Sequence, residues 1–407
     1  QQARFRETDF RATFSETVEK VSDLVVRARL DDGNPGAAFT SLERARLAAW
    51  PAGTSARASS VTPDQLRARL PPGMLVVEYA VLVDRLVIWT VSRGGWRVHH
   101  VAAPRDSLRA LAARLPAELA RADAGGASAL ARLYDLLLRP LQPELAAARR
   151  VVVVPDRELH AVPFTALWNR DNGGFAVEAN EFSTAPSAGF LVEVLSRRVS
   201  RGSSGTALVV GNPALNGTLD ENLDPLPDAA REAEQVARLY PRSTLLVGAE
   251  AERGRVVALL PGASMVHFAG HAVFDADRPE RSYLALAPGP GSDSRLQAGK
   301  IGGLRLSNLQ VVVLSACSTI NPRPSRAGGV AGLAYSFLHA GAPAIVSTLW
   351  DVGDADVSQL LVTFHRARRD GLTPSQALRR AQLDALHSTS RAVRAPRTWA
   401  AFTYTGL

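Results

Sequence analysis

Cysteine is nearly absent from this sequence, which has 407 residues and a single cysteine, Cys317. One cysteine excludes an internal disulfide framework and any metal site built from several cysteines. No other cluster of metal ligands stands out, so we expect neither a metal nor a cofactor. Because an unpaired thiol suits a reducing compartment, we expect a cytoplasmic protein.

Long apolar runs are also missing. No stretch of about 18 or more consecutive apolar residues occurs, so we expect no membrane span. The sequence starts at Gln1 with polar residues of mixed charge, which is unlike a signal peptide. We therefore interpret it as a piece of a longer polypeptide.

Lysine is scarce too, and the net charge of +8 comes almost entirely from arginine, because lysine occurs only at Lys20 and Lys300. This usage resembles that of a GC-rich bacterial genome. The arginines are scattered, and no basic run is interleaved with aromatic residues. We therefore expect no nucleic-acid partner.

Composition divides the chain into four segments. Residues 1–50 have the pattern of two amphipathic helices joined at the turn signal of residues 31–36. This pair resembles the last unit of a tetratricopeptide-type array, and a simple helical hairpin packed on the next domain explains it equally well. Residues 51–73 are rich in Pro, Ser, Gly and Arg and are predicted to be a linker, and two α/β halves follow at 74–200 and 201–407.

Strands and helices alternate through both halves. This alternation predicts a mostly parallel sheet with helices on both faces. Ligands of such sheets bind beyond the carboxyl ends of the strands. The predicted strands are 75–83, 85–91, 96–101, 151–154, 207–210, 244–247, 264–268, 283–287, 311–314, 343–349 and 399–404.

Two of these buried strands lead to reactive side chains. One runs through residues 265–268 to His271, and the other runs through residues 311–314 to Cys317. If the two strands are neighbours in one parallel sheet, both tips emerge at the same edge. A nearby imidazole lowers the pKa of a thiol, takes its proton and can later protonate a leaving amine. We therefore predict Cys317 as a nucleophile and His271 as its base.

Small residues around both positions allow backbone to approach backbone, and we expect the amides of Cys317 and Ala272 to hold a developing oxyanion. The alternative for Cys317 is a buried structural cysteine. Its place at a strand end among small polar residues favours the nucleophile. His267 lies inside its strand, where we expect a packed or supporting histidine. The histidines on predicted helices are expected at the surface or in the core (His339, His365, His387).

Several short motifs occur in a characteristic order. They are an apolar strand, Pro-Asp and Leu-His-Ala-Val-Pro-Phe within 151–164, His-Phe-Ala-Gly-His at 267–271, Leu-Ser-Ala-Cys-Ser-Thr at 314–319, a Gly/Ala pattern within 328–342, Leu-Trp-Asp-Val-Gly-Asp at 349–354 and Trp-Ala-Ala-Phe at 399–402. Together they resemble the CHAT domain, a caspase-like peptidase domain that is related to separase and often fused to tetratricopeptide repeats. The resemblance covers roughly residues 70–407.

The resemblance implies a caspase/separase fold in which a degenerate N-terminal half supports an active C-terminal half. It implies cleavage of a protein substrate through an acyl-enzyme by Cys317 and His271, which are 46 residues apart, close to the roughly 50 typical of caspases. Ala272 stands where the family often has glycine, but alanine still presents a backbone amide. The caspase cysteine signature is absent, so specificity for aspartate is not implied.

Specificity is expected to depend on residues 350–356. The matching stretch of separase-like enzymes supplies an acid that holds a basic substrate residue. By resemblance Asp354 is the first candidate for this acid, with Asp351 and Asp356 behind it and Trp350 in the same stretch. An aspartate before a helix is equally well explained as an N-cap.

Two other functions fit parts of the sequence. A catalytically silent scaffold that binds protein partners would use the same fold, although Cys317 and His271 are both present. A nucleotide-binding module would need a glycine-rich phosphate loop after a strand, and the sequence has none. The resemblance also suggests an activating protein partner or an N-terminal repeat domain that passes on a signal.

Overall fold

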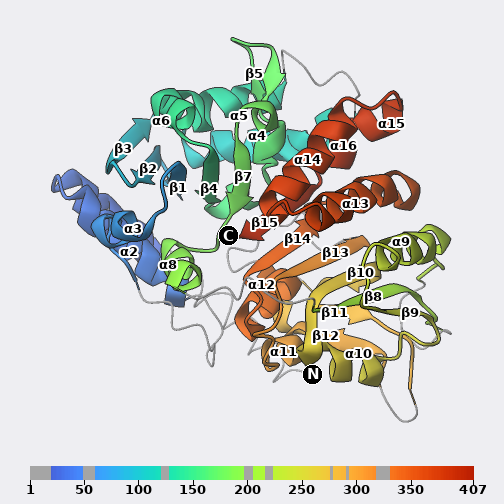
Figure 1. Cartoon of the computed structure of the whole chain (residues 1–407). Helices are drawn as coiled ribbons and strands as arrows, with labels where there is room; N and C mark the ends of the chain where they lie inside the picture. The colour runs from blue at the N-terminus through green and yellow to red at the C-terminus, as the bar shows by residue number, and fades with distance from the viewer. Residues whose placement is uncertain are drawn as a thin grey trace, which may run out of the picture.

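The computed structural model shows the chain folded around one broad sheet (Figure 1). It describes residues 20–48, 60–120, 128–196, 205–215, 223–275, 278–289, 293–317 and 331–407. Within these ranges the main sheet has 13 strands, and a separate ribbon pairs β5 (Trp168–Asn169) with β6 (Gly174–Phe175).

The strands of the main sheet come from both halves of the chain. Their bounds are β1 (Met74–Val81), β2 (Leu86–Ser92), β3 (Gly95–Val101), β4 (Arg150–Val154), β7 (Glu181–Thr184), β8 (Thr206–Pro213), β9 (Ser243–Gly248), β10 (Ala263–Val273), β11 (Tyr283–Ala285), β12 (Arg295–Gln297), β13 (Val311–Cys317), β14 (Ala344–Thr348) and β15 (Phe402–Gly406). The order across the sheet is β12-β11-β10-β13-β14-β15-β7-β4-β1-β2-β3, with β8 paired to β10 and β9 paired to β8.

The pairing is mostly parallel, as predicted. Parallel neighbours are β9–β8, β8–β10, β10–β13, β13–β14, β15–β7, β7–β4 and β4–β1. Antiparallel neighbours are β14–β15, β1–β2, β2–β3, β10–β11 and β11–β12.

Strands in the middle of the sheet, such as β1, β4 and β14, are buried on both faces, because they consist largely of apolar residues. Side chains alternate between the two faces along a strand. In β4, for example, Val151 and Val153 belong to one apolar cluster, and Val152 and Val154 belong to another. We call these clusters the first-face and second-face clusters.

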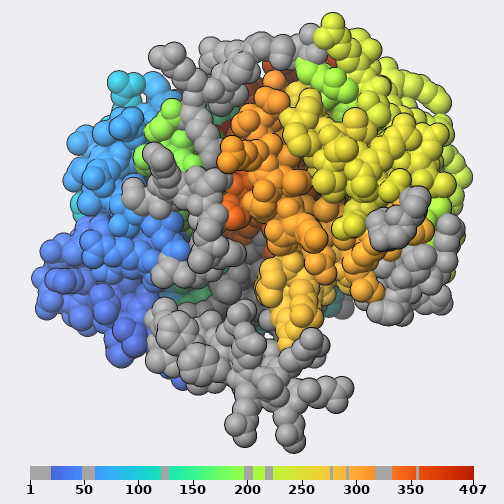
Figure 2. Space-filling model, turned by 90° about the horizontal axis from the view of Figure 1, so that it is seen from below, coloured from blue at the N-terminus to red at the C-terminus, as the bar shows by residue number. Residues whose placement is uncertain are grey.

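Helices cover each face (Figure 1). The first-face cluster includes side chains of α4 (Arg105–Leu119), α5 (Ala129–Leu137), α9 (Pro227–Ala237), α13 (Asp354–Arg369) and α14 (Pro374–Leu386). The second-face cluster includes side chains of α2 (Pro35–Ala48), α3 (Pro63–Arg69), α8 (Ala188–Ser196), α10 (Arg253–Leu259), α11 (Ala298–Gly302) and α12 (Ala331–Ala340). Figure 2 shows residues of the N-terminal half in blue to one side and the region of α10–α12 in yellow and orange to the other.

Short helices fill the connections. They are α6 (Gln142–Ala147), α7 (Ala176–Ala179), α15 (Arg391–Arg394) and α16 (Pro396–Trp399), with single 3₁₀ turns η1 (Arg139–Leu141), η2 (Arg157–Ala161), η3 (Phe164–Ala166), η4 (Leu260–Gly262) and η5 (Pro279–Arg281).

The N-terminal helical pair is packed on the sheet. Residues 20–31 are helical, and α2 follows the predicted turn. Phe39 of α2 packs edge-on against Trp89 of β2 with ring centroids 5.9 Å apart, and the Trp89 indole donates a 3.0 Å hydrogen bond to the Pro35 carbonyl. The pair therefore contributes to the second-face cluster.

Part of the predicted linker is a packed helix. Residues 63–69, within the segment 51–73, form α3, and Leu66 on this helix is fully buried. A capping box fixes its start, because the side chains of Thr62 and Gln65 each accept a hydrogen bond from the other residue's backbone amide. The linker prediction is therefore wrong for these residues.

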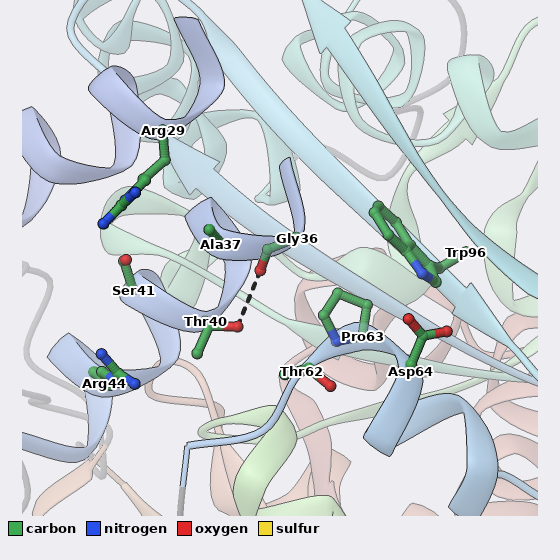
Figure 3. A pocket seen from close by; sticks show the side chains of 10 residues that line it. All are labelled: Arg29, Gly36, Ala37, Thr40, Ser41, Arg44, Thr62, Pro63, Asp64 and Trp96. Carbon is green, nitrogen blue, oxygen red and sulfur yellow. Dashed lines mark hydrogen bonds between the residues drawn. The ribbon is translucent and has the colours of Figure 1, made fainter. Parts of the chain in front are cut away.

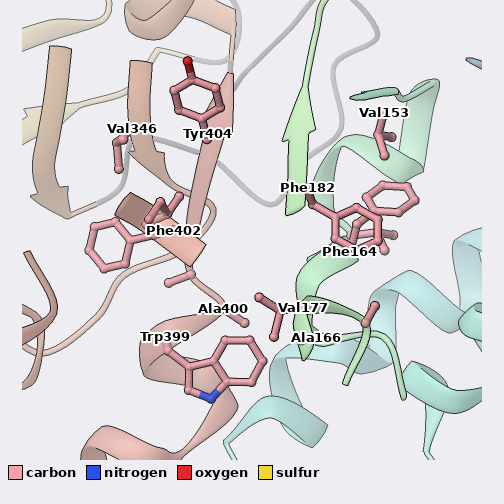
Figure 4. Packing of buried hydrophobic residues seen from close by; sticks show 14 of the residues in the cluster. Val153, Phe164, Ala166, Val177, Phe182, Val346, Trp399, Ala400, Phe402 and Tyr404 are labelled. Atoms are coloured by element: carbon pink, nitrogen blue, oxygen red, sulfur yellow. The ribbon is translucent and has the colours of Figure 1, made fainter. Parts of the chain in front are cut away.

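The two halves meet at the pairing of β15 with β7, where Thr405 lies opposite Thr184. Aromatic side chains of both halves pack beside this junction (Figure 4). The rings of Phe175 and Trp399 lie 5.2 Å apart, centroid to centroid. The first-face cluster therefore continues from one half into the other.

Candidate active site

His271 and Cys317 lie on neighbouring strands. β10 and β13 run parallel in an unbroken register from Met265 opposite Val311 to His271 opposite Cys317. The backbones of neighbouring strands are about 4.8 Å apart. The prediction that these two strands are neighbours, with both residues at one edge of the sheet, is confirmed.

β10 extends further than predicted. The predicted strand ended at residue 268, but β10 continues to Val273 because β11 pairs with its last residues, where Ala272 lies opposite Leu284. His271 is therefore part of the strand instead of following it. Strand pairing fixes its backbone.

The imidazole of His271 is oriented by a backbone group. Its Nε2 lies 2.7 Å from the carbonyl oxygen of Asp224, and the side chain is half-buried. A carbonyl oxygen can only accept, so Nε2 carries the hydrogen of this bond. In the neutral ring Nδ1 then keeps its lone pair, which is the form that a general base requires.

The Asp224 carbonyl belongs to the segment that leads into α9, and α9 is seated very close to β8. A Cβ on Gly211 would lie 2.4 Å from the Cβ of Ala233, so only glycine allows this approach. Asn212, with a φ of 41°, accepts a 3.0 Å hydrogen bond from the amide of Leu226. The end of β8 thus fixes both the start of α9 and the carbonyl that precedes it.

Cys317 is the last residue of β13, and residues 318–330 lie outside the described part of the chain. The carbonyl of Ala316 accepts a buried 3.0 Å hydrogen bond from Oγ1 of Thr348 in β14. This bond ties the end of β13 to its other neighbour.

The amides predicted to bind an oxyanion belong to these strand ends. Ala272 is buried opposite β11, and Cys317 lies opposite His271. Both positions have backbones fixed by pairing, and the oxyanion role of their amides stays a prediction.

The predicted specificity segment joins β14 to α13. Trp350 is half-buried and donates its indole hydrogen to the Arg397 carbonyl at 2.8 Å, and Asp351 is exposed. The N-cap of α13 is Gly353, so Asp354 is the first helical residue and not the cap. Asp354 and Asp356 therefore begin the helix that follows β14, and recognition of a basic residue stays a prediction.

The other histidines lie in the core and at the surface. His267 is fully buried on β10, as predicted. His365 is fully buried on α13, His339 is half-buried and His387 is exposed. Buried imidazoles need polar partners.

One such partner was missed from the sequence. Glu232 of α9 is fully buried, and its Oε1 lies 2.9 Å from Nε2 of His267. A signal was present, because Glu232 falls between Ala229 and Ala233 on the apolar side of a predicted helix. A carboxylate in such a stripe requires a buried partner.

A separate surface groove lies on the N-terminal helical pair. It has a volume of about 450 Å³. Figure 3 shows the guanidinium groups of Arg29 and Arg44 on one side and Trp96 with Asp64 on the other. None of the predicted site residues lines it, so this groove is not the candidate active site.

The described ranges contain neither a metal-binding cluster nor a membrane-spanning helix. In them, no group of three or more His, Cys, Asp or Glu side chains is placed to hold a metal ion. Among the helices that the structure describes, none combines the length and the apolar character needed to cross a membrane.

The fold is similar to that of part of separase. The separase–securin complex of Saccharomyces cerevisiae, solved at 3.0 Å, matches with a TM-score of 0.55 over 92% of this chain and 34% of that chain, at 11% sequence identity. The same complex at 2.6 Å matches with a TM-score of 0.52 over the same shares and at the same identity. At this identity the likeness shows the fold alone.

The chain belongs to the CHAT domain family, whose pattern matches residues 127–407. Tetratricopeptide repeat protein 28 of Mus musculus is 29% identical over 330 residues, which cover 68% of this chain and 13% of that protein. The human protein of the same name is 28% identical with the same coverage. The chain thus spans only a small part of the length of these relatives.

Proposed function

We propose that this chain is a cysteine endopeptidase with Cys317 as nucleophile and His271 as base. The observation that carries the proposal is the register of β10 with β13, in which these two residues lie opposite each other. Membership of the CHAT family and the separase fold support it, because separase-like domains include peptidases.

The reaction follows from the state of the His271 ring. Nδ1 takes the proton of the Cys317 thiol while Nε2–H remains bonded to the Asp224 carbonyl. The thiolate attacks the peptide carbonyl carbon, the C–N bond breaks, and the imidazolium returns the proton to the leaving amine. In the second half, Nδ1 takes a proton from the water that attacks the thioester carbonyl, the C–S bond breaks, and the imidazolium returns the proton to the Cys317 thiolate. The amides of Cys317 and Ala272 stabilise the oxyanion.

The substrate of this activity is a protein with a basic residue before the cleaved bond. The acids of residues 351–356, with Asp354 first among them, supply the negative charge that recognises it. The segment follows β14, the neighbour of the strand that carries the nucleophile.

Activity of this site depends on a protein partner or on repeats that precede the described helices. The support is the family context, since relatives that share the domain are named as tetratricopeptide repeat proteins. A reducing, cytoplasmic compartment would keep the Cys317 thiol free.

A peptide library incubated with the protein and read by mass spectrometry tests the proposal. We expect cleavage by the wild type that is abolished in Cys317→Ala and in His271→Ala. Cleavage that persists in Cys317→Ala would contradict it. A folded wild type that cleaves nothing, and whose Cys317 titrates as an ordinary thiol, would instead identify the silent scaffold.

A further inference from the structure

A chain of polar side chains lies beneath the candidate active site, and the proposed reaction does not use it. Oε1 of Glu232 lies 2.9 Å from Nε2 of His267, whose Nδ1 lies 3.0 Å from Nε2 of His365. Nδ1 of His365 lies 2.8 Å from the hydroxyl of Tyr240. We call these four residues the polar chain. It joins α9, β10 and α13, and its first three members are fully buried.

Burial keeps two members of the polar chain in their neutral form. Burial raises the pKa of Tyr240 to about 12, so its hydroxyl stays protonated. Burial, and then the nearby charges of His267 and Arg368, lower the pKa of His365 well below its ordinary value, so this ring is neutral. The neutral ring of His365 therefore bridges Tyr240 and His267, with one ring nitrogen donating and the other accepting.

Glu232 and His267 form a pair at one end of the polar chain, and no other group in the described residues can take the place of either partner. In the described part of the molecule, neither Nε2 of His267 nor either carboxylate oxygen of Glu232 has a hydrogen-bond partner, so the 2.9 Å ion-pair contact between Nε2 and Oε1 is what compensates their burial. Removing one partner would leave the other buried without compensation. The pair therefore couples the position of α9 to that of β10.

This coupling reaches His271 by two routes. His267 and His271 lie four residues apart on β10, so they share one face of the sheet. Glu232 lies on α9, and the segment that leads into α9 carries the Asp224 carbonyl that binds Nε2 of His271. A shift of α9 relative to β10 would lengthen that hydrogen bond.

We propose that Glu232 and His267 are positioning residues for the imidazole of His271. They hold α9 against β10 so that the Asp224 carbonyl keeps the hydrogen on Nε2 and leaves Nδ1 free to accept a proton. This inference rests on the proposed function, because it assumes that His271 serves Cys317. Neither residue touches the reacting atoms.

Alkylation by iodoacetamide tests this without a substrate. Cys317 is the only cysteine in the sequence, so the modified mass reports this thiol alone. The alkylation rate is measured from about pH 5 to pH 10. An ordinary thiol reaches half of its maximal alkylation rate at about pH 8.5, and a paired imidazole shifts this midpoint downward.

Variants of the pair separate positioning from bulk stability. His267→Phe keeps an aromatic ring and removes both polar contacts, whereas His267→Gln can still donate to Glu232. We expect His267→Phe to raise the midpoint by about one unit, which slows alkylation roughly tenfold below the midpoint. His267→Gln should restore most of the rate. Glu232→Gln, which keeps its size, should shift the midpoint in the same direction as His267→Phe.

A matched control replaces another buried carboxyl group, that of Glu78 in the N-terminal half. Glu78→Gln should leave the alkylation midpoint of Cys317 unchanged. A wild-type midpoint in folded His267→Phe and Glu232→Gln would overturn the positioning role. If the wild type and His271→Ala share the midpoint of an ordinary thiol, the dyad itself fails, and this outcome is distinct from the first.

Discussion

The buried acid pair Glu43 and Glu78 predicts an unusual pH dependence of stability. Both carboxyl groups are fully buried, and Nη1 of Arg46 lies 3.2 Å from Oε1 of Glu78 and 3.9 Å from Oε1 of Glu43. Burial raises the pKa of Glu78 well above its ordinary value, and the neighbouring Glu43 raises it further. Burial also raises the pKa of Glu43, against the opposing effect of Arg46. Since one guanidinium compensates one carboxylate, the folded protein keeps a proton on the pair to a higher pH than an ordinary carboxyl group would.

The sign of the effect follows from proton linkage. The unfolded chain releases this proton near the ordinary pKa of 4.5, whereas the folded protein keeps it to a higher pH. The stabilisation is therefore complete below about pH 4.5 and is lost as the pH rises toward the folded pKa, by up to about 1.4 kcal/mol per unit. Glu78→Gln replaces the protonated acid with a neutral group of the same size and removes this titration.

The assay is urea unfolding followed by tryptophan fluorescence at several values between about pH 5 and pH 8. Between about pH 5 and pH 7, the free energy of unfolding of the wild type should fall relative to that of Glu78→Gln by up to about 3 kcal/mol. Glu250→Gln, at an exposed carboxylate, should parallel the wild type. Equal pH dependence in the wild type and Glu78→Gln would refute the shared proton.

Two further predictions concern the packing of α9 against β8 and the specificity segment. Gly211→Ala should lower the free energy of unfolding in urea by about 1–3 kcal/mol, because its Cβ would overlap Ala233. The control Gly262→Ala places its Cβ in open space and should change this free energy by no more than about 0.5 kcal/mol. Equal effects of the two substitutions would contradict the close approach of α9 to β8. Asp354→Asn should lower kcat/KM for arginine-containing peptides about tenfold or more and spare neutral ones, because a charge-assisted hydrogen bond is lost; a uniform loss across a peptide library would contradict this recognition.

The sequence predicts the strands that carry the candidate site because these strands are long and apolar. β10 and β13 are recognisable as buried runs, and parallel strands bring their carboxyl ends to one edge, so His271 and Cys317 could be brought together without a structure. The short strands β7 and β12 were missed. With four and three residues, they carry too little pattern to stand out from a loop.

The contacts that orient the site were beyond sequence reasoning for a different reason. The partner of His271 is the backbone carbonyl of Asp224, and a carbonyl is present at every residue, so no residue type marks it. Glu232 can be recognised in the sequence as a carboxylate within the apolar stripe of its helix, but its partner His267 lies on a separate strand. Such pairings depend on how α9 crosses the sheet.

The position of β15 has a consequence for how the protein is assembled. Residues 402–406 lie between β14 and β7, so this strand completes the middle of the sheet and joins its two parts. A variant without these residues would leave β14 and β7 with open edges, and such edges invite aggregation. β15 is thus the link through which the strands β1–β4 and the strands that carry His271 and Cys317 form one sheet.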